Sequence, residues 1–97
     1  MTFHNADSVL MLDDEYDIMS IFTLALERQG YHVIGFTEPQ LASDHFQKNS
    51  DLYWLIVSDI RMPLMDGYQY IIRVKKIKHD VNTHILATIF TLELDFR

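Results

Sequence analysis

Apolar runs alternate with amphipathic stretches along most of this 97-residue chain. Residues 9–12 and 53–58 form two nearly continuous apolar runs, which predict strands buried on both faces. Residues 31–34 predict another strand, and residues 85–88, or 85–90, predict a fourth. The first and third of these strands run directly into aspartates, Asp13–Asp14 and Asp59.

The segments between the strands have helical periodicity. Residues 15–29 predict an amphipathic helix that ends at Gly30, with an inward face formed by Ile18, Ile21, Phe22, Ala25 and Leu26. A second helix is predicted to begin with Thr37 as its N-cap and to fade near residues 49–50. A third is predicted over residues 68–78, and the remaining residues through 97 could begin another; the inward residues of the third are Ile71, Ile72 and Val74.

Strands that alternate with helices predict a single α/β domain over residues 1–97, with a doubly wound parallel sheet and helices on both faces. Ligands bind such sheets at the carboxyl ends of the strands. Because the first and third strands both end in aspartate, we expect Asp13, Asp14 and Asp59 to lie at one rim.

Three carboxylates at one rim require a physical reason. Like charges held close together raise one another's pKa or require a cation, and Mg²⁺ prefers oxygen ligands of this kind. A carboxylate can also act as a nucleophile toward a phosphoryl group. The alternative is that these acids only solvate the strand ends, and the residue types alone leave the two interpretations about equal.

Two local sequences favour the chemical interpretation. Residues 9–15, VLMLDDE, resemble the start of response-regulator receiver domains, and residues 59–67, DIRMPLMDG, resemble the phosphoacceptor loop of that family. The second motif is highly specific, and the two lie at the separation that the family shows. The resemblance implies a flavodoxin-like fold with the strand order 2-1-3-4. Receiver domains have a fifth strand next to strand 4, and one of them is a standard example of this fold.

The resemblance implies a role for each site residue. Asp59 would accept a phosphoryl group from a sensor histidine kinase or from a small phosphodonor. Asp14 would bind Mg²⁺ directly, Asp13 would help through water or a second contact, and the backbone carbonyl of Arg61 would supply a further ligand. Pro63 and Gly67 would shape the loop. Such a protein is a cytoplasmic signalling module that acts on a downstream protein partner and is not an enzyme.

The chain departs from the family pattern in two places. Thr88 is the candidate for the switch hydroxyl at the end of the fourth strand, but it lies one residue further from Asp59 than expected, and Ala87 stands at the expected place. The lysine that ends the fifth strand in the family has no counterpart, because none of the lysines follows the fourth strand. We therefore expect a domain that is incomplete at its C-terminal end, whose fourth strand could form a homodimer through an exposed edge.

Composition limits the other functions. A net charge of −6 disfavours general nucleic-acid binding, the absence of cysteine excludes thiolate chemistry, and no apolar run is long enough for a signal or membrane segment. One alternative is a receiver-like binding or oligomerisation module that no longer switches. A phosphatase of the haloacid dehalogenase type is a weaker alternative, because it requires an aspartate where Arg61 stands.

Overall fold

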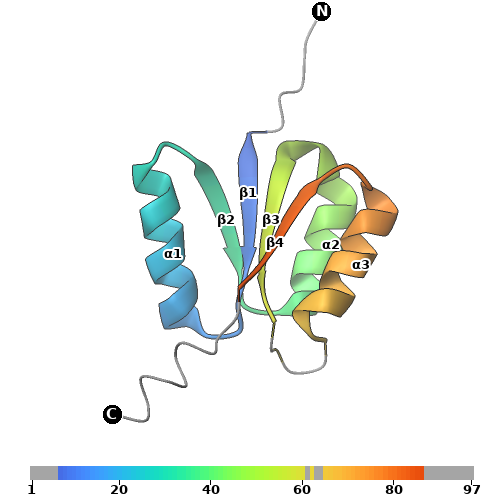
Figure 1. The fold of residues 1–97 in the computed structure, drawn as a ribbon, viewed down its shortest axis with the longest axis horizontal. Helices are drawn as coiled ribbons and strands as arrows, with labels where there is room; N and C mark the ends of the chain where they lie inside the picture. The colour runs from blue at the N-terminus through green and yellow to red at the C-terminus, as the bar shows by residue number, and fades with distance from the viewer. Residues whose placement is uncertain (1–6, 61, 63–64, 87–97) are drawn as a thin grey trace, which may run out of the picture.

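A computed structural model describes residues 7–60, 62 and 65–86, and the last two of these by their backbone alone. Strands and helices alternate along the chain (Figure 1). Their bounds are β1 Ser8–Leu12, α1 Tyr16–Arg28, β2 His32–Phe36, α2 Pro39–Asn49, a 3-10 turn Ser50–Leu52, β3 Tyr53–Asp59, α3 Gly67–Ile77 and β4 Asn82–Leu86. None of the helices in these ranges is long and apolar enough to cross a membrane.

The four strands form one parallel sheet in the order β2-β1-β3-β4, which confirms the predicted strand order. The central strands β1 and β3 pair with Leu12 beside Ser58, so their carboxyl ends are level. Both strands read as apolar runs because helices cover the sheet on both faces (Figure 1). This topology brings the carboxyl ends of β1 and β3 to a common rim.

Two apolar clusters hold the helices to the sheet. Helices α2 and α3 cover one face through a cluster built around Leu10, Phe46, Tyr70 and Val74. Tyr70 also donates a hydrogen bond from its hydroxyl to the carbonyl of Ala42 at 3.3 Å, which joins the two helices. Helix α1 covers the opposite face through a smaller cluster, whose buried members are Val9, Met11, Met19, Val33 and Val57.

The predicted inward faces of two helices were partly wrong. In α1, Met19 is the buried residue, and Phe22 and Leu26 pack beside it, whereas Ile21 is 63% exposed. Met19 lies against Gly35 of β2, where any Cβ atom would collide with its sulfur. In α3, Val74 is buried as expected, but Ile72 is 57% exposed.

The helix ends also differ in part from the prediction. The N-cap of α2 is Glu38 and not Thr37, and Pro39 begins the helix, where its fixed φ and missing N–H cost nothing. Gly30 follows α1 with φ +97°, and its N–H donates to the carbonyl of Glu27, as expected for a glycine after a helix. Lys78 turns back after α3, and its ammonium donates to the carbonyls of Ser50 and Tyr53.

Strand β4 begins at Asn82, three residues before the predicted start. Its first residues are polar because it lies at the edge of the described sheet, where Asn82 and His84 are exposed. Within the described residues β4 pairs with β3 alone, and dimerisation through its other edge stays a prediction. The continuation predicted beyond residue 86, including Thr88, and the helix predicted after it lie outside the described residues.

We expect Phe46→Ala to lower the free energy of unfolding by about 3–5 kcal/mol, because Phe46 is fully buried in the larger cluster. Leu41→Ala is the matched control on the same helix: Leu41 is 52% exposed, and the change should stay within about 0.5 kcal/mol. Urea unfolding followed by circular dichroism measures both. Equal losses for the two variants would show that α2 does not anchor the core in this way.

Candidate metal and phosphoacceptor site

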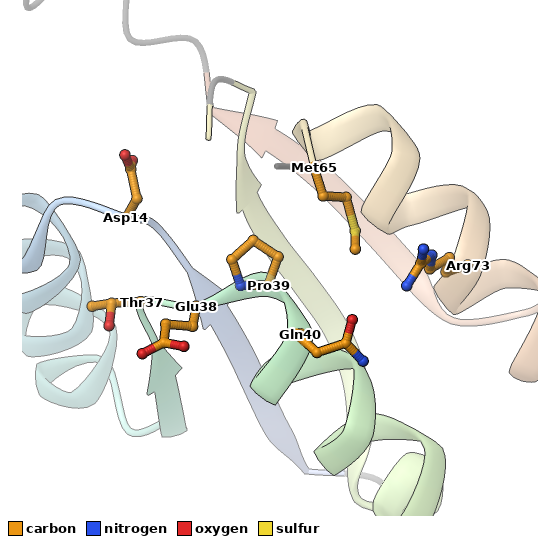
Figure 2. Close-up of a pocket in the computed structure, with 7 residues that line it drawn as sticks. All are labelled: Asp14, Thr37, Glu38, Pro39, Gln40, Met65 and Arg73. Atoms are coloured by element: carbon orange, nitrogen blue, oxygen red, sulfur yellow. The ribbon is translucent and has the colours of Figure 1, made fainter. Parts of the chain in front are cut away.

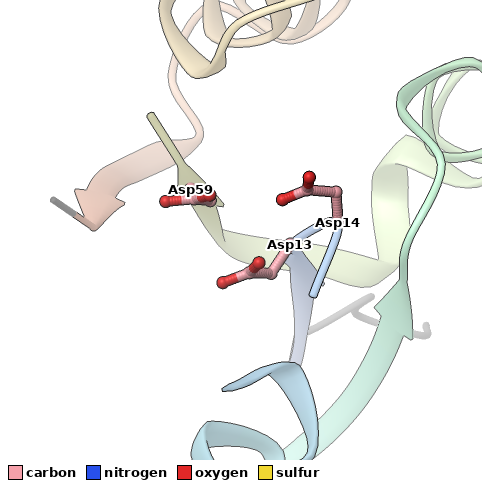
Figure 3. A group of neighbouring side chains, drawn as sticks. All are labelled: Asp13, Asp14 and Asp59. Atoms are coloured by element: carbon pink, nitrogen blue, oxygen red, sulfur yellow. The ribbon is translucent and has the colours of Figure 1, made fainter. Parts of the chain in front are cut away.

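The aspartates predicted to share one rim do so. Asp13 follows β1, Asp14 is the next residue, and Asp59 is the last residue of β3 (Figure 3). One carboxylate oxygen from each of the three lies within 4.8 Å of the others. Asp13 and Asp59 are each 1% exposed, whereas Asp14 is open to solvent.

Asp13 is held by the backbone on both sides. Its N–H donates to the carbonyl of Phe36 at 3.1 Å, and its Oδ1 accepts from the N–H of Glu15 at 2.9 Å. Its Oδ2 is buried and has no hydrogen-bond partner within the described part of the chain. Such an atom costs free energy unless a ligand satisfies it.

The pKa of Asp13 also indicates that its negative charge is unfavourable without a ligand. Burial raises the pKa of this carboxyl above its ordinary value of 3.8; the hydrogen bond from Glu15 lowers it, and the neighbouring charges of Asp14 and Glu15 raise it further. The folded chain therefore holds a proton on Asp13 more tightly than the unfolded chain does. A bound cation would remove this penalty.

The chemistry of the donor set fits Mg²⁺. All three groups are carboxylates, and Mg²⁺ takes oxygen ligands while it retains several waters. Opposite oxygens around this ion stand about 4.1 Å apart, twice its usual bond length, so the observed spread requires either a small side-chain adjustment or one ligand acting through water. Within the described residues the Oδ2 of Asp13 has no hydrogen-bond partner, which is a second reason to expect a cation here.

The loop after β3 fixes the orientation of Asp59. The N–H of Ile60 donates to Asp59 Oδ1 at 2.9 Å, and the hydroxyl of Ser58 donates to the Asp59 carbonyl at 3.0 Å. The loop closes where the N–H of Gly67 donates to the carbonyl of Ile60 at 3.0 Å. A Cβ atom on Gly67 would collide with the backbone carbonyl of Asp59, so this position requires glycine.

Asp66 has a structural role that was not predicted from the motif. It is the N-cap of α3, and its Oδ1 accepts from the N–H of Gln69 at 2.9 Å. The signal was an aspartate at the start of a predicted helix, a preferred N-cap residue. Two other predicted site residues, Arg61 with its carbonyl ligand and Thr88, lie outside the described residues, as does Pro63.

Comparison with known proteins assigns the chain to one family. The model of the response regulator receiver domain matches residues 9–93, so the chain belongs to the response regulator receiver domain family. Members of this family are the signalling domains of two-component systems, in which phosphorylation and Mg²⁺ binding are general features.

Individual relatives agree with this assignment. The response regulator receiver protein CpdR of Brucella abortus is 33% identical over 73 residues, which cover 75% of this chain and 59% of CpdR. The phosphoglycerate transport system transcriptional regulatory protein PgtA of Salmonella typhimurium is 37% identical over 60 residues, which are 62% of this chain and 14% of PgtA. The chain thus spans less than two thirds of either relative.

The fold is shared with solved receiver domains. A response regulator receiver domain protein from Clostridium thermocellum superposes with a TM-score of 0.80 at 23% identity, covering 92% of this chain and 73% of that protein. This likeness confirms the flavodoxin-like arrangement.

We expect Gly67→Ala to lower the free energy of unfolding by about 1–3 kcal/mol, because the new methyl group must displace the Asp59 backbone. The measurement is urea unfolding, with Tyr68→Ala as a control at the next position, where the side chain is 57% exposed. An unchanged Gly67→Ala variant would show that the loop does not approach α3 this closely.

Asp13→Asn should stabilise the metal-free chain at neutral pH and abolish stabilisation by Mg²⁺. The raised pKa makes the contribution of Asp13 to stability greatest below pH 3.8 and lost as the pH rises through the folded-state pKa. Asparagine removes the charge but keeps the acceptor for the Glu15 N–H. Urea unfolding at acidic and neutral pH, with and without Mg²⁺, tests this expectation, and a variant less stable than wild type at neutral pH without Mg²⁺ would contradict it.

Proposed function

We propose that this chain is a phosphoacceptor module of two-component signalling, in which Asp59 receives a phosphoryl group from a sensor histidine kinase. The observation that carries the proposal is a buried Asp59, oriented by the Ile60 N–H and placed beside two further carboxylates. Membership of the receiver family supports it independently.

In the proposed step, a carboxylate oxygen of Asp59 attacks phosphorus and forms a P–O bond. The bond from phosphorus to the donor breaks, and the electron pair leaves with the imidazole of a phosphohistidine or with the acetate of acetyl phosphate. The product on the protein is an aspartyl-phosphate. The Ile60 N–H donates to Asp59 Oδ1 and so helps to orient the carboxylate for this attack.

Mg²⁺, when bound, supplies positive charge that neutralises the transferring phosphoryl oxygens. Asp13, Asp14 and Asp59 would hold it, with the backbone carbonyl of Arg61 as a further proposed ligand. Burial of Asp13 and Asp59 lowers the local dielectric, which strengthens their attraction for the cation.

The output passes to a protein partner in this proposal. The phosphorylated rim carries additional negative charge, which favours a different arrangement of the surrounding loops, and a partner that binds one arrangement reads the change. Switch residues of the family, including the candidate Thr88, belong to this part of the proposal.

Asp59→Asn should abolish Mg²⁺-dependent phosphorylation by acetyl phosphate, because an amide is not a nucleophile toward phosphorus. Asp66→Asn is the matched control: it removes the same charge from the same loop, but asparagine remains a good N-cap for α3. Intact-protein mass spectrometry should show one added phosphoryl group in wild type and in Asp66→Asn. Unchanged labelling of Asp59→Asn would sink the proposal, and failure of wild type to label or to bind Mg²⁺ would favour a module that has lost its switch.

A further inference from the structure

A groove of about 370 Å³ lies beside the carboxylate cluster and shares one residue with it (Figure 2). Its walls come from the loop after β1, the start of α2, the loop before α3 and α3 itself. The lining residues are Asp14, Thr37, Glu38, Pro39, Gln40, Met65 and Arg73. A ligand in this groove would therefore touch elements that the rim also depends on.

Charge is distributed unevenly along the groove. Asp14 and Glu38 lie on one side of Pro39, and Arg73 lies on the other (Figure 2). All three charged residues are exposed. Each charge is consequently accessible to a group on another molecule.

Between the charged ends Pro39 and Met65 form an apolar floor, and the exposed polar residue Gln40 lies beside them (Figure 2). Pro39 is buried as the first residue of α2, and Met65 is 7% exposed. Methionine adapts its shape to irregular partners at low cost. A branched apolar side chain can cover Pro39 and Met65 while groups on either side of it reach the two charged ends.

We propose that this groove docks a peptide segment of a partner protein with a basic, an apolar and an acidic side chain in sequence. The acidic side chain pairs with Arg73, the apolar one covers Pro39 and Met65, and the basic one pairs with Glu38 and Asp14. Nucleic acid does not fit, because its phosphates would meet the two acids. The proposal adds the chemistry of a partner to the proposed function. It rests on that function only where it predicts competition between the peptide and Mg²⁺.

The probe is the peptide acetyl-Lys-Ala-Leu-Ala-Glu-amide, titrated into the full ¹⁵N-labelled chain and followed by NMR. Amide shifts should change for Asp14, Glu38, Met65 and Arg73. Two control peptides, one with alanine for leucine and one with glutamine for both charged residues, should bind more weakly. Absence of shifts at millimolar peptide, or shifts confined to α1, would overturn the proposal.

Variants test the charge pairing. Arg73→Glu should weaken binding at least about fivefold, as expected for an exposed ion pair replaced by repulsion. Acetyl-Lys-Ala-Leu-Ala-Lys-amide should restore affinity for that variant. Arg28→Glu makes the same charge change on α1 and should leave affinity unchanged. If Arg73→Glu unfolds, Arg73→Gln replaces it, and wild-type affinity in a folded Arg73 variant would refute the pairing.

Peptide titrations with and without Mg²⁺ distinguish this proposal from the proposed function. A cation on Asp14 should weaken peptide binding, and the peptide should weaken Mg²⁺ binding by the same factor. An intact Arg73 effect without any Mg²⁺ effect would support the groove and count against the metal site. Mg²⁺ binding without an Arg73 effect would do the reverse.

Discussion

Parallel pairing of β1 with β3 places Asp13 and Asp59 at one rim and buries both carboxylates. The sheet cannot keep its register and separate them, because Leu12 lies beside Ser58 in the ladder. Two buried carboxylates with a third within 4.8 Å would repel one another if all three were ionised, because the local dielectric is low. The raised pKa of Asp13 and the lack of a hydrogen-bond partner for its Oδ2 among the described residues are local consequences of this constraint. The sheet therefore concentrates negative charge at this rim, and a proton on Asp13 or a bound cation would reduce the repulsion.

The loop after β3 is shaped by the same constraint. Backbone groups hold Asp59 in place: the Ile60 N–H donates to its Oδ1, and the N–H of Gly67 closes the turn onto the carbonyl of Ile60. The close approach of Gly67 to the Asp59 carbonyl excludes any side chain there. Asp66 then starts α3, whose buried Val74 anchors the loop to the larger core. The start of α3 therefore contributes both to the stability of the domain and to the position of Asp59.

The sequence predicted the features that depend on local patterns, and it did not predict those that depend on packing between distant segments. Asp13, Asp14 and Asp59 were predictable because parallel strands always present their carboxyl ends at one edge. The inward face of α1 was not predictable, because it depends on a residue of β2. Gly35 has no side chain, and this leaves room for Met19 to pack against the sheet. Periodicity alone could not rank Met19 above Ile21. The early start of β4 was missed because its first residues are polar, as an edge strand permits.

Asp14 differs from Asp13 and Asp59 in its exposure to solvent. Asp13 and Asp59 are buried and each accepts a backbone N–H, whereas Asp14 is exposed and borders the neighbouring groove as well. An exposed carboxylate can exchange ligands without breaking the fold. Any group that binds Asp14 from the groove must compete with a cation bound from the rim, and the competition is reciprocal by thermodynamic necessity. Communication between the rim and a partner would then require no large conformational change, only two ligands that compete for one carboxylate.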